Sequence, residues 1–165
     1  EYVTTLNCHK GSGSTYTILK DGSDFYLYSY RISNNYGIIK QLVVKMDNVI
    51  DLDKAEFFGA SNMLSVIYYT VGNKLYGYDF ARKKCELLKT FDGYEITLFS
   101  SDILVQTSSD YFYIALYDPS KPTSTGGMIM KYKVVDDVDH IIIEEEKGSE
   151  WKNLCKVKSI AFKTR

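Results

Sequence analysis

Residues able to bind a metal or act as nucleophiles are few in this chain of 165 residues. The two histidines and three cysteines are His9, His140, Cys8, Cys85 and Cys155. Only Cys8 and His9 are close in sequence, and adjacency is not the ligand spacing of a zinc site. The chain has no Gly-x-Ser-x-Gly elbow and no cysteine with an evident partner base. We therefore predict no metal site, no cofactor and no catalytic residue.

An oxygen-rich stretch of the chain has the residue types of a calcium site. It contains Asp47, Asn48, Asp51 and Asp53. It lacks the central glycine and the distal glutamate of the known calcium loop. The stretch is therefore interpreted as a solvated turn.

A tryptophan is the candidate ligand-binding residue. Carbohydrate sites place exposed aromatic rings beside planar polar groups, because sugars present apolar faces ringed by hydroxyls. Trp151, in an expected loop over residues 148–153, is the only tryptophan and the natural candidate. The alternative, which we favour, is that its amphipathic ring packs as a lid over the last strands.

Composition limits the classes of partner. The net charge is −1 and the pI is about 6.2, so there is no electrostatic case for binding nucleic acid. No apolar run of 18 residues is present, so we expect no direct membrane insertion of this segment. The three cysteines have no framework spacing and are expected to be buried free thiols on strands.

The elements that must position these residues are strands. The cassette Leu27–Tyr30 recurs as Leu75–Tyr78 and, in degenerate form, as Ile129–Tyr132, each after a turn signal. The chain holds 15 Tyr and 8 Phe, which favour strands, and no sustained helical periodicity. Repetition of a four-stranded unit over some tens of residues is typical of β-propeller blades. The predicted fold is all-β: antiparallel four-stranded blades forming a partial β-propeller of about three blades.

The predicted organisation is one flexible connector and three blades. Residues 1–14 contain Gly11-Ser12-Gly13-Ser14 and form the connector. The blades cover about 15–62, 63–101 and 102–165. Their expected strands are 15–20, 24–32, 37–46 and 54–60; 63–71, 74–80, 85–91 and 94–99; and 103–107, 111–117, 127–135, 140–146 and 155–163. A short helix beginning near Asp53 is an open alternative to the strand at 54–60.

The segment Tyr68–Asp79 resembles the "YAVGNKLYRYD" pattern of PKD-like family lipoproteins from Bacteroidetes. Residues 55–61 and 156–163 look similar to that family too, and the resemblance extends over about 15–165. Gly77 stands where a larger residue is common, and the terminal strand lacks an expected preceding glycine. In such proteins a lipid anchor and immunoglobulin-like modules precede a propeller-like region, which implies an exported protein of the bacterial cell envelope. The family brings no catalytic residues to this chain.

The leading functional expectation is a non-enzymatic binding or scaffold module of a cell-envelope lipoprotein, with a glycan or an envelope protein as partner. Three blades do not close a ring, so self-association through open blade edges is also expected. The alternative is a fragment of a propeller hydrolase or lyase whose active site lies partly in missing blades. With 21 acidic residues, a carboxylate pair is neither identified nor excluded.

Overall fold

The fold is all-β and consists of three antiparallel sheets. The structure is a computed structural model that describes residues 1–6, 15–61, 64–101, 111–136 and 139–160. In these residues the chain forms thirteen strands and one short 3-10 helix. The first four strands of each sheet form a meander in which strands adjacent in sequence are adjacent in space. The all-β part of the prediction is therefore confirmed.

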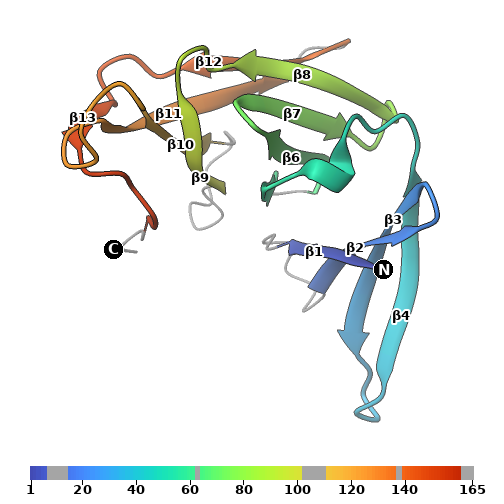
Figure 1. The fold of residues 1–165 in the computed structure, drawn as a ribbon. Helices are drawn as coiled ribbons and strands as arrows, with labels where there is room; N and C mark the ends of the chain where they lie inside the picture. The colour runs from blue at the N-terminus through green and yellow to red at the C-terminus, as the bar shows by residue number, and fades with distance from the viewer. Residues whose placement is uncertain (7–14, 62–63, 102–110, 137–138, 161–165) are drawn as a thin grey trace.

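Sheet 1 is built from the N-terminal strands in the order β1-β2-β3-β4. The strands are β1 (Tyr2–Leu6), β2 (Thr15–Asp21), β3 (Asp24–Ile32) and β4 (Ile38–Met46). The tight turn between β2 and β3 places Gly22 at φ +61°, a conformation that costs glycine little. Figure 1 shows the β3–β4 hairpin extending away from the other two sheets.

Sheet 2 follows a 3-10 helix over Leu52–Lys54 and has the order β5-β6-β7-β8. Its strands are β5 (Phe57–Ala60), β6 (Val66–Val71), β7 (Lys74–Asp79) and β8 (Lys84–Thr90). Gly72, at φ +57°, makes the turn between β6 and β7 as Gly22 does in sheet 1.

Sheet 3 has the order β9-β10-β11-β12, with β13 also paired to β11. Its strands are β9 (Glu95–Ser101), β10 (Tyr111–Tyr117), β11 (Gly127–Asp136), β12 (Ile141–Glu145) and β13 (Trp151–Leu154). β12 pairs with the Tyr132–Asp136 end of β11, whereas β13 pairs with the Gly127–Ile129 end. β12 and β13 thus follow one edge of β11, separated by residues 146–150.

The repeated cassettes occupy equivalent places, in the third strand of each sheet. Leu27 of β3 and Leu75 of β7 both immediately precede a shift of register with the fourth strand. The shared irregularity aligns Tyr28 with Tyr76 and Tyr30 with Tyr78. Repetition in the sequence therefore corresponds to repetition in the structure.

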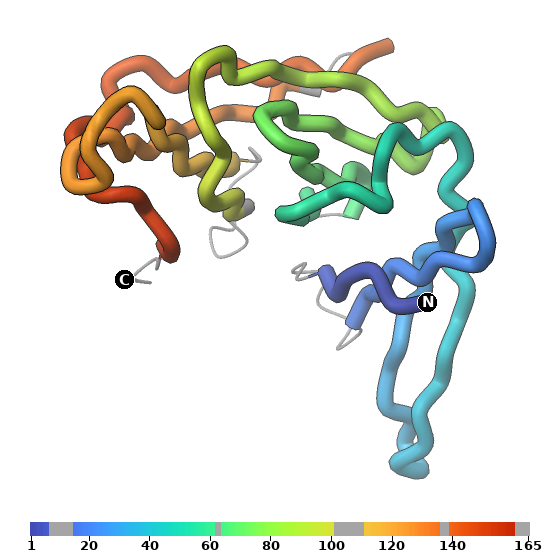
Figure 2. The backbone as a smooth tube through the Cα atoms, viewed as in Figure 1, coloured from blue at the N-terminus to red at the C-terminus, as the bar shows by residue number. Residues whose placement is uncertain are grey.

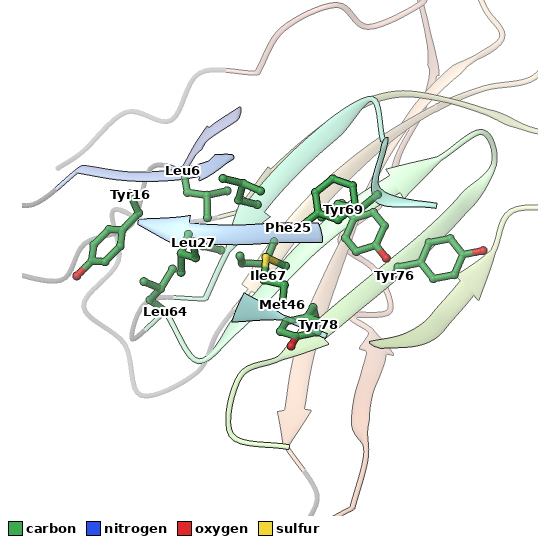
Figure 3. Close-up of a cluster of buried hydrophobic side chains, with 13 residues drawn as sticks. Leu6, Tyr16, Phe25, Leu27, Met46, Leu64, Ile67, Tyr69, Tyr76 and Tyr78 are labelled. Carbon is green, nitrogen blue, oxygen red and sulfur yellow. The ribbon is translucent and has the colours of Figure 1, made fainter. Parts of the chain in front are cut away.

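The sheets pack in chain order and share two apolar cores. Side chains of sheets 1 and 2 form the first core, including Ile18, Leu27, Ile67 and Tyr78 (Figure 3). Sheets 2 and 3 form the second, around Tyr68, Leu75 and Phe112. Sheet 2 contributes to both cores because alternate residues of a strand point to opposite faces. Figure 1 and Figure 2 show the three sheets following an arc, with β4, β8 and β12 on its outer side.

The sheet boundaries fall one strand earlier than the predicted blade boundaries. β5 was expected to end the first unit but pairs with β6, and β9 was expected to end the second but pairs with β10. Residues 1–14 were expected to be a connector, yet Tyr2–Leu6 pairs with β2 and completes sheet 1. The open helical alternative near Asp53 is realised only as the single 3-10 turn before β5.

The C-terminal region also differs from expectation. Trp151 begins strand β13 instead of lying in a loop, because the chain returns to β11 after residue 150. Within the expected strand 155–163, the described residues 155–160 are not in a strand. The expected strand 103–107 lies outside the described residues.

Candidate functional site

The residues considered for metal binding do not gather in the part of the chain that the structure describes. Cys85 is half-buried on β8, and Cys155 is exposed just after β13, so the expectation of a buried thiol is wrong for Cys155. His140 precedes β12 and is exposed. Cys8 and His9 lie outside the described residues. No group of three histidine, cysteine, aspartate or glutamate side chains able to hold a metal ion occurs within the described ranges.

The oxygen-rich stretch forms the turn from β4 to the 3-10 helix. Asn48 and Asp51 have positive φ, at +58° and +48°, as suits a tight turn. The carboxylates face lysines: Asp51 Oδ1 lies 2.6 Å from Lys54 Nζ, and Asp53 Oδ2 lies 3.8 Å from Lys20 Nζ. This agrees with the interpretation as a solvated turn.

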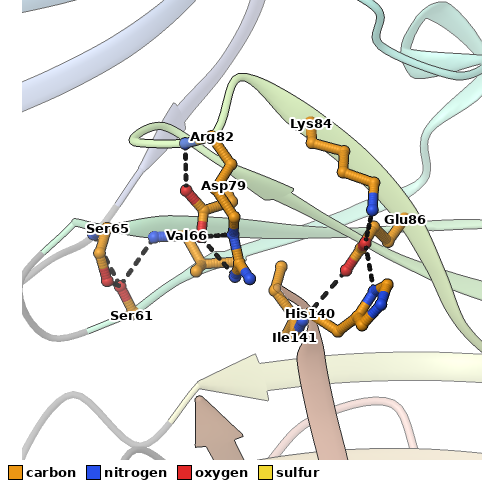
Figure 4. Close-up of polar contacts among 9 residues, drawn as sticks. All are labelled: Ser61, Ser65, Val66, Asp79, Arg82, Lys84, Glu86, His140 and Ile141. Carbon is orange, nitrogen blue, oxygen red and sulfur yellow. Dashed lines mark hydrogen bonds and ion pairs between the residues drawn. The ribbon is translucent and has the colours of Figure 1, made fainter. Parts of the chain in front are cut away.

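Among the described carboxyl groups, Glu86 of β8 has the most strongly shifted pKa. Its side chain connects sheet 2 with sheet 3 (Figure 4). Its Oε1 lies 3.0 Å from His140 Nδ1, and its Oε2 accepts a hydrogen bond of 3.0 Å from the Ile141 N–H. Burial alone would raise the pKa of Glu86, but hydrogen bonds from Lys84, Ile141 and His140 lower it to about 2. A carboxyl group with so low a pKa stays ionised and has no proton to donate, so it does not suit a general acid. Its contacts instead connect β8 with β12.

A second polar cluster closes the β7–β8 turn, also in Figure 4. Asp79 accepts hydrogen bonds from the backbone N–H and the Nε of Arg82, at 2.8 Å and 2.9 Å. The Arg82 guanidinium also lies 2.7 Å from Asp79 Oδ2. These contacts satisfy a buried carboxylate next to the turn, which is a structural role.

Trp151 lies on the face of sheet 3 that points away from sheet 2. Its side chain is 50% exposed, and its ring centroid lies 6.4 Å from that of Tyr113 on β10. Lys131 of the neighbouring β11 forms an ion pair with Glu146 on the same side of the sheet. The Trp151 ring thus lies against Tyr113 of the last sheet while half of its surface stays exposed, so an aromatic pair with adjacent charged groups lies on this face.

Among the described residues, most of the exposed large hydrophobic side chains belong to the β3–β4 hairpin of sheet 1. In β3 the side chains of Phe25 and Leu27 enter the first core, so the alternate residues point to the opposite face. We call this opposite face of the β3–β4 hairpin the sheet 1 outer face. Its members are Tyr28, Tyr30, Ile32, Ile38, Lys40 and Leu42. The pairs Tyr28 with Leu42, Tyr30 with Lys40 and Ile32 with Ile38 lie opposite one another, and Lys40 Nζ sits 4.1 Å from the Tyr28 ring centroid.

Equivalent residues of sheet 2 are buried. Tyr76 and Tyr78 correspond to Tyr28 and Tyr30, and their exposed fractions are 6% and 0% because sheet 1 covers them. In the sheet 1 outer face the same two positions are only half-buried, and Ile38 beside them is 77% exposed. Because the cassette is the same in both sheets, the difference in burial comes from the neighbouring sheet: sheet 1 covers this face of sheet 2, and no described sheet covers the sheet 1 outer face.

The charge of the β3–β4 hairpin is a signal in the sequence that the search for functional residues missed. The segment from Phe25 to Met46 contains Arg31, Lys40 and Lys45 and no acidic residue. It therefore combines apolar and basic character. Exposed apolar side chains gathered on one face of a sheet indicate an association surface, because a packed sheet covers such side chains.

Comparisons of the chain with protein-family models, curated protein sequences and solved structures give no significant match. Among the described residues, no helix is long and apolar enough to cross a membrane.

Proposed function

We propose that the chain is a non-enzymatic scaffold module, a partial β-propeller that binds a further β-sheet through the sheet 1 outer face. Three features support the propeller arrangement. The first four strands of each sheet form a sequential meander, the sheets pack face to face in chain order, and their first strands contact one another, β1 with β5 and β5 with β9. The functional proposal rests on a difference in burial between equivalent tyrosines. Tyr28 and Tyr30 of sheet 1 are half-exposed, whereas Tyr76 and Tyr78 of sheet 2 are buried.

The partner with the required chemistry is a second copy of the chain. β12 is an outer strand of sheet 3 and exposes Ile142 together with Glu144 on the face that points away from the second core. An apolar and acidic strand complements the apolar and basic hairpin that bears Ile38 and Lys40. Contact of sheet 3 of one copy with sheet 1 of the next is head-to-tail, and such contacts form rings when the rotation closes.

The test is the mass of the protein in solution, measured by light scattering during size exclusion. The unmodified 18.9 kDa chain is expected to give a dimer or larger ring at micromolar concentrations. The double variant Ile38→Lys, Leu42→Lys is expected to be a monomer, because three like charges would then crowd the surface around Lys40.

The matched control is Leu87→Lys, since Leu87 is an exposed apolar residue on β8 that does not belong to the sheet 1 outer face. This variant is expected to associate like the unmodified chain. A monomer at all concentrations for the unmodified chain, or equal association of the double variant, would contradict the proposal.

A second candidate function, carbohydrate binding, is favoured by the pair of the exposed Trp151 and the half-buried Tyr113. Trp151→Ala is expected to remove binding to a glycan panel, while Ile142→Ala, a change at another exposed apolar residue of sheet 3, leaves it intact. Absence of binding by the unmodified chain to every glycan would exclude this candidate.

A location in the bacterial cell envelope is proposed on the resemblance of Tyr68–Asp79 to PKD-like family lipoproteins. The test is fractionation of the cells that produce the natural protein, with detection by an antibody raised against this chain. Recovery with the outer membrane is the expected result, and recovery with the cytosolic fraction would contradict it.

A further inference from the structure

A pocket lies between sheets 2 and 3, on a different part of the molecule from the sheet 1 outer face. Its volume is about 330 Å³, at the small end of the range for ligand sites. One wall is the end of β8 and the turn into β9, and the other is formed by β10 and β11. The lining residues are Lys89, Thr90, Phe91, Asp92, Tyr94, Leu116, Met128, Met130, Tyr132 and Lys152.

The walls of the pocket are apolar and aromatic. Phe91, Leu116 and Tyr132 are buried, and the rings of Phe91 and Tyr132 meet edge to face with centroids 6.2 Å apart. Met128 and Met130 are half-buried and line the same space. Methionine side chains adapt their shape and make favourable contacts with aromatic rings, so this wall suits a flat apolar ligand.

The charged groups of the pocket are two lysines and one aspartate. Lys152 Nζ is 3.4 Å from Glu150 and is therefore already paired. Lys89 Nζ lies 5.3 Å from the Tyr132 ring centroid and 5.7 Å from that of Phe91, and among the described residues no carboxylate lies within ion-pair distance of it. Asp92 is exposed on the turn. Within the described ranges, Lys89 thus has no ion-pair partner and places its positive charge beside the aromatic wall.

We infer that this pocket binds a small aromatic carboxylate. The ring packs between the methionines and the Phe91–Tyr132 pair, and the carboxylate accepts a charge-assisted hydrogen bond from Lys89. An apolar wall offers a sugar few hydrogen-bond partners, and Lys89 disfavours a cationic ligand. The site does not depend on association of the chain, because all of its residues belong to one copy.

The test uses 2-naphthoate as the probe and the labelled ε-methyl groups of methionine as the NMR readout. The signals of Met128 and Met130 are expected to shift on titration, whereas that of Met46, buried in the first core, stays in place. Its unchanged position also confirms that the fold persists. No shift of the Met128 and Met130 signals at concentrations up to about 5 mM, near the weak end of measurable affinity, would overturn the inference.

The role of Lys89 is tested by Lys89→Met, which keeps the length of the side chain and removes the charge. Affinity for 2-naphthoate is expected to fall about tenfold, or about 1.4 kcal/mol. Affinity for the uncharged 2-naphthalenemethanol is expected to stay the same. Lys158→Met, at an exposed lysine that does not line the pocket, is the control and is expected to bind both probes normally. If Lys89→Met lowered the affinity for both probes equally, or for neither, Lys89 would not recognise the carboxylate.

Discussion

At the scale of single residues, Glu86 offers the sharpest prediction. Its pKa in the folded chain is about 2, against an ordinary value of 4.5. A depressed pKa contributes stability that is complete above the ordinary value and is lost as the pH falls from about 4.5 toward 2. As the pH falls through this window, we therefore expect the free energy of unfolding of the unmodified chain to decrease by on the order of 1–3 kcal/mol more than that of Glu86→Gln.

Urea unfolding at pH 7, 4 and 3 measures this difference. Glu144→Gln, at an exposed carboxylate of β12, is the control and is expected to keep the pH dependence of the unmodified chain. Parallel pH profiles for the unmodified chain and Glu86→Gln would show that the contacts with Lys84, Ile141 and His140 do not stabilise the carboxylate.

Tyr69 gives a second prediction at this scale. Its buried hydroxyl donates a hydrogen bond of 2.7 Å to the Ile50 carbonyl and lies 3.0 Å from Cys85 Sγ. Tyr69→Phe leaves the Ile50 carbonyl without this donor while preserving the ring that stacks on Tyr76. The free energy of unfolding is expected to fall by about 1–2 kcal/mol, measured by urea denaturation. Tyr36→Phe, at an exposed loop tyrosine, is expected to change it little, and an equal loss in both would contradict this role for the hydroxyl.

The candidate residues illustrate what sequence predicts at this scale. The solvated turn at 47–53 was predictable because asparagine and aspartate favour local turns over shared coordination. The Glu86–His140 contact was not, since it joins residues from two sheets whose packing the sequence does not specify. The different burial of Tyr28 and Tyr76 was also hidden, because both occupy the same cassette.

At the scale of elements, Gly77 shows why one cassette contains a glycine. A Cβ at this position of β7 would lie 2.9 Å from Ile141 Cδ1 and 3.0 Å from Leu88 Cδ1. The space that a side chain at this position would occupy is thus filled by Ile141 of sheet 3 and Leu88 of β8. Gly77→Val is expected to destabilise the chain by about 1–3 kcal/mol through overpacking.

A double-mutant cycle with Ile141→Ala separates this effect from a general loss of stability. The cavity left by Ile141→Ala can accommodate the valine. The double variant is therefore expected to lose less free energy of unfolding than the two single variants lose in sum. Additive losses in denaturant titrations would show that Gly77 is not limited by Ile141.

Most strands were predictable because their signals are local. Turns with Gly22 and Gly72 mark hairpins, and alternating aromatic residues mark the strands between them. The grouping of strands into sheets was not predictable to the same degree. Phe57–Ala60 and Glu95–Ser101 lie between two hairpins, and their propensity does not specify which neighbour they join.

At the scale of the whole molecule, the two cores are coupled because sheet 2 belongs to both. Ile18→Ala changes only the first core and is expected to cost about 2–5 kcal/mol, since Ile18 is fully buried there. Trp151, on sheet 3, is expected to report this loss through its fluorescence, at the same denaturant midpoint as circular dichroism. Two separate transitions, with the Trp151 signal unaffected by Ile18→Ala, would mean that the sheets unfold independently.

In the first two sheets every strand after the first pairs with the strand that precedes it in the chain, and this has a consequence for biosynthesis. A nascent chain emerging from the ribosome releases all of β1–β4 before β5 appears, and all of β5–β8 before β9. No strand of the first two sheets has to wait for a partner made much later, which shortens the time for which bare strand edges are open to wrong pairing. Translation itself can therefore set the order in which the three sheets assemble, from the N-terminus onward.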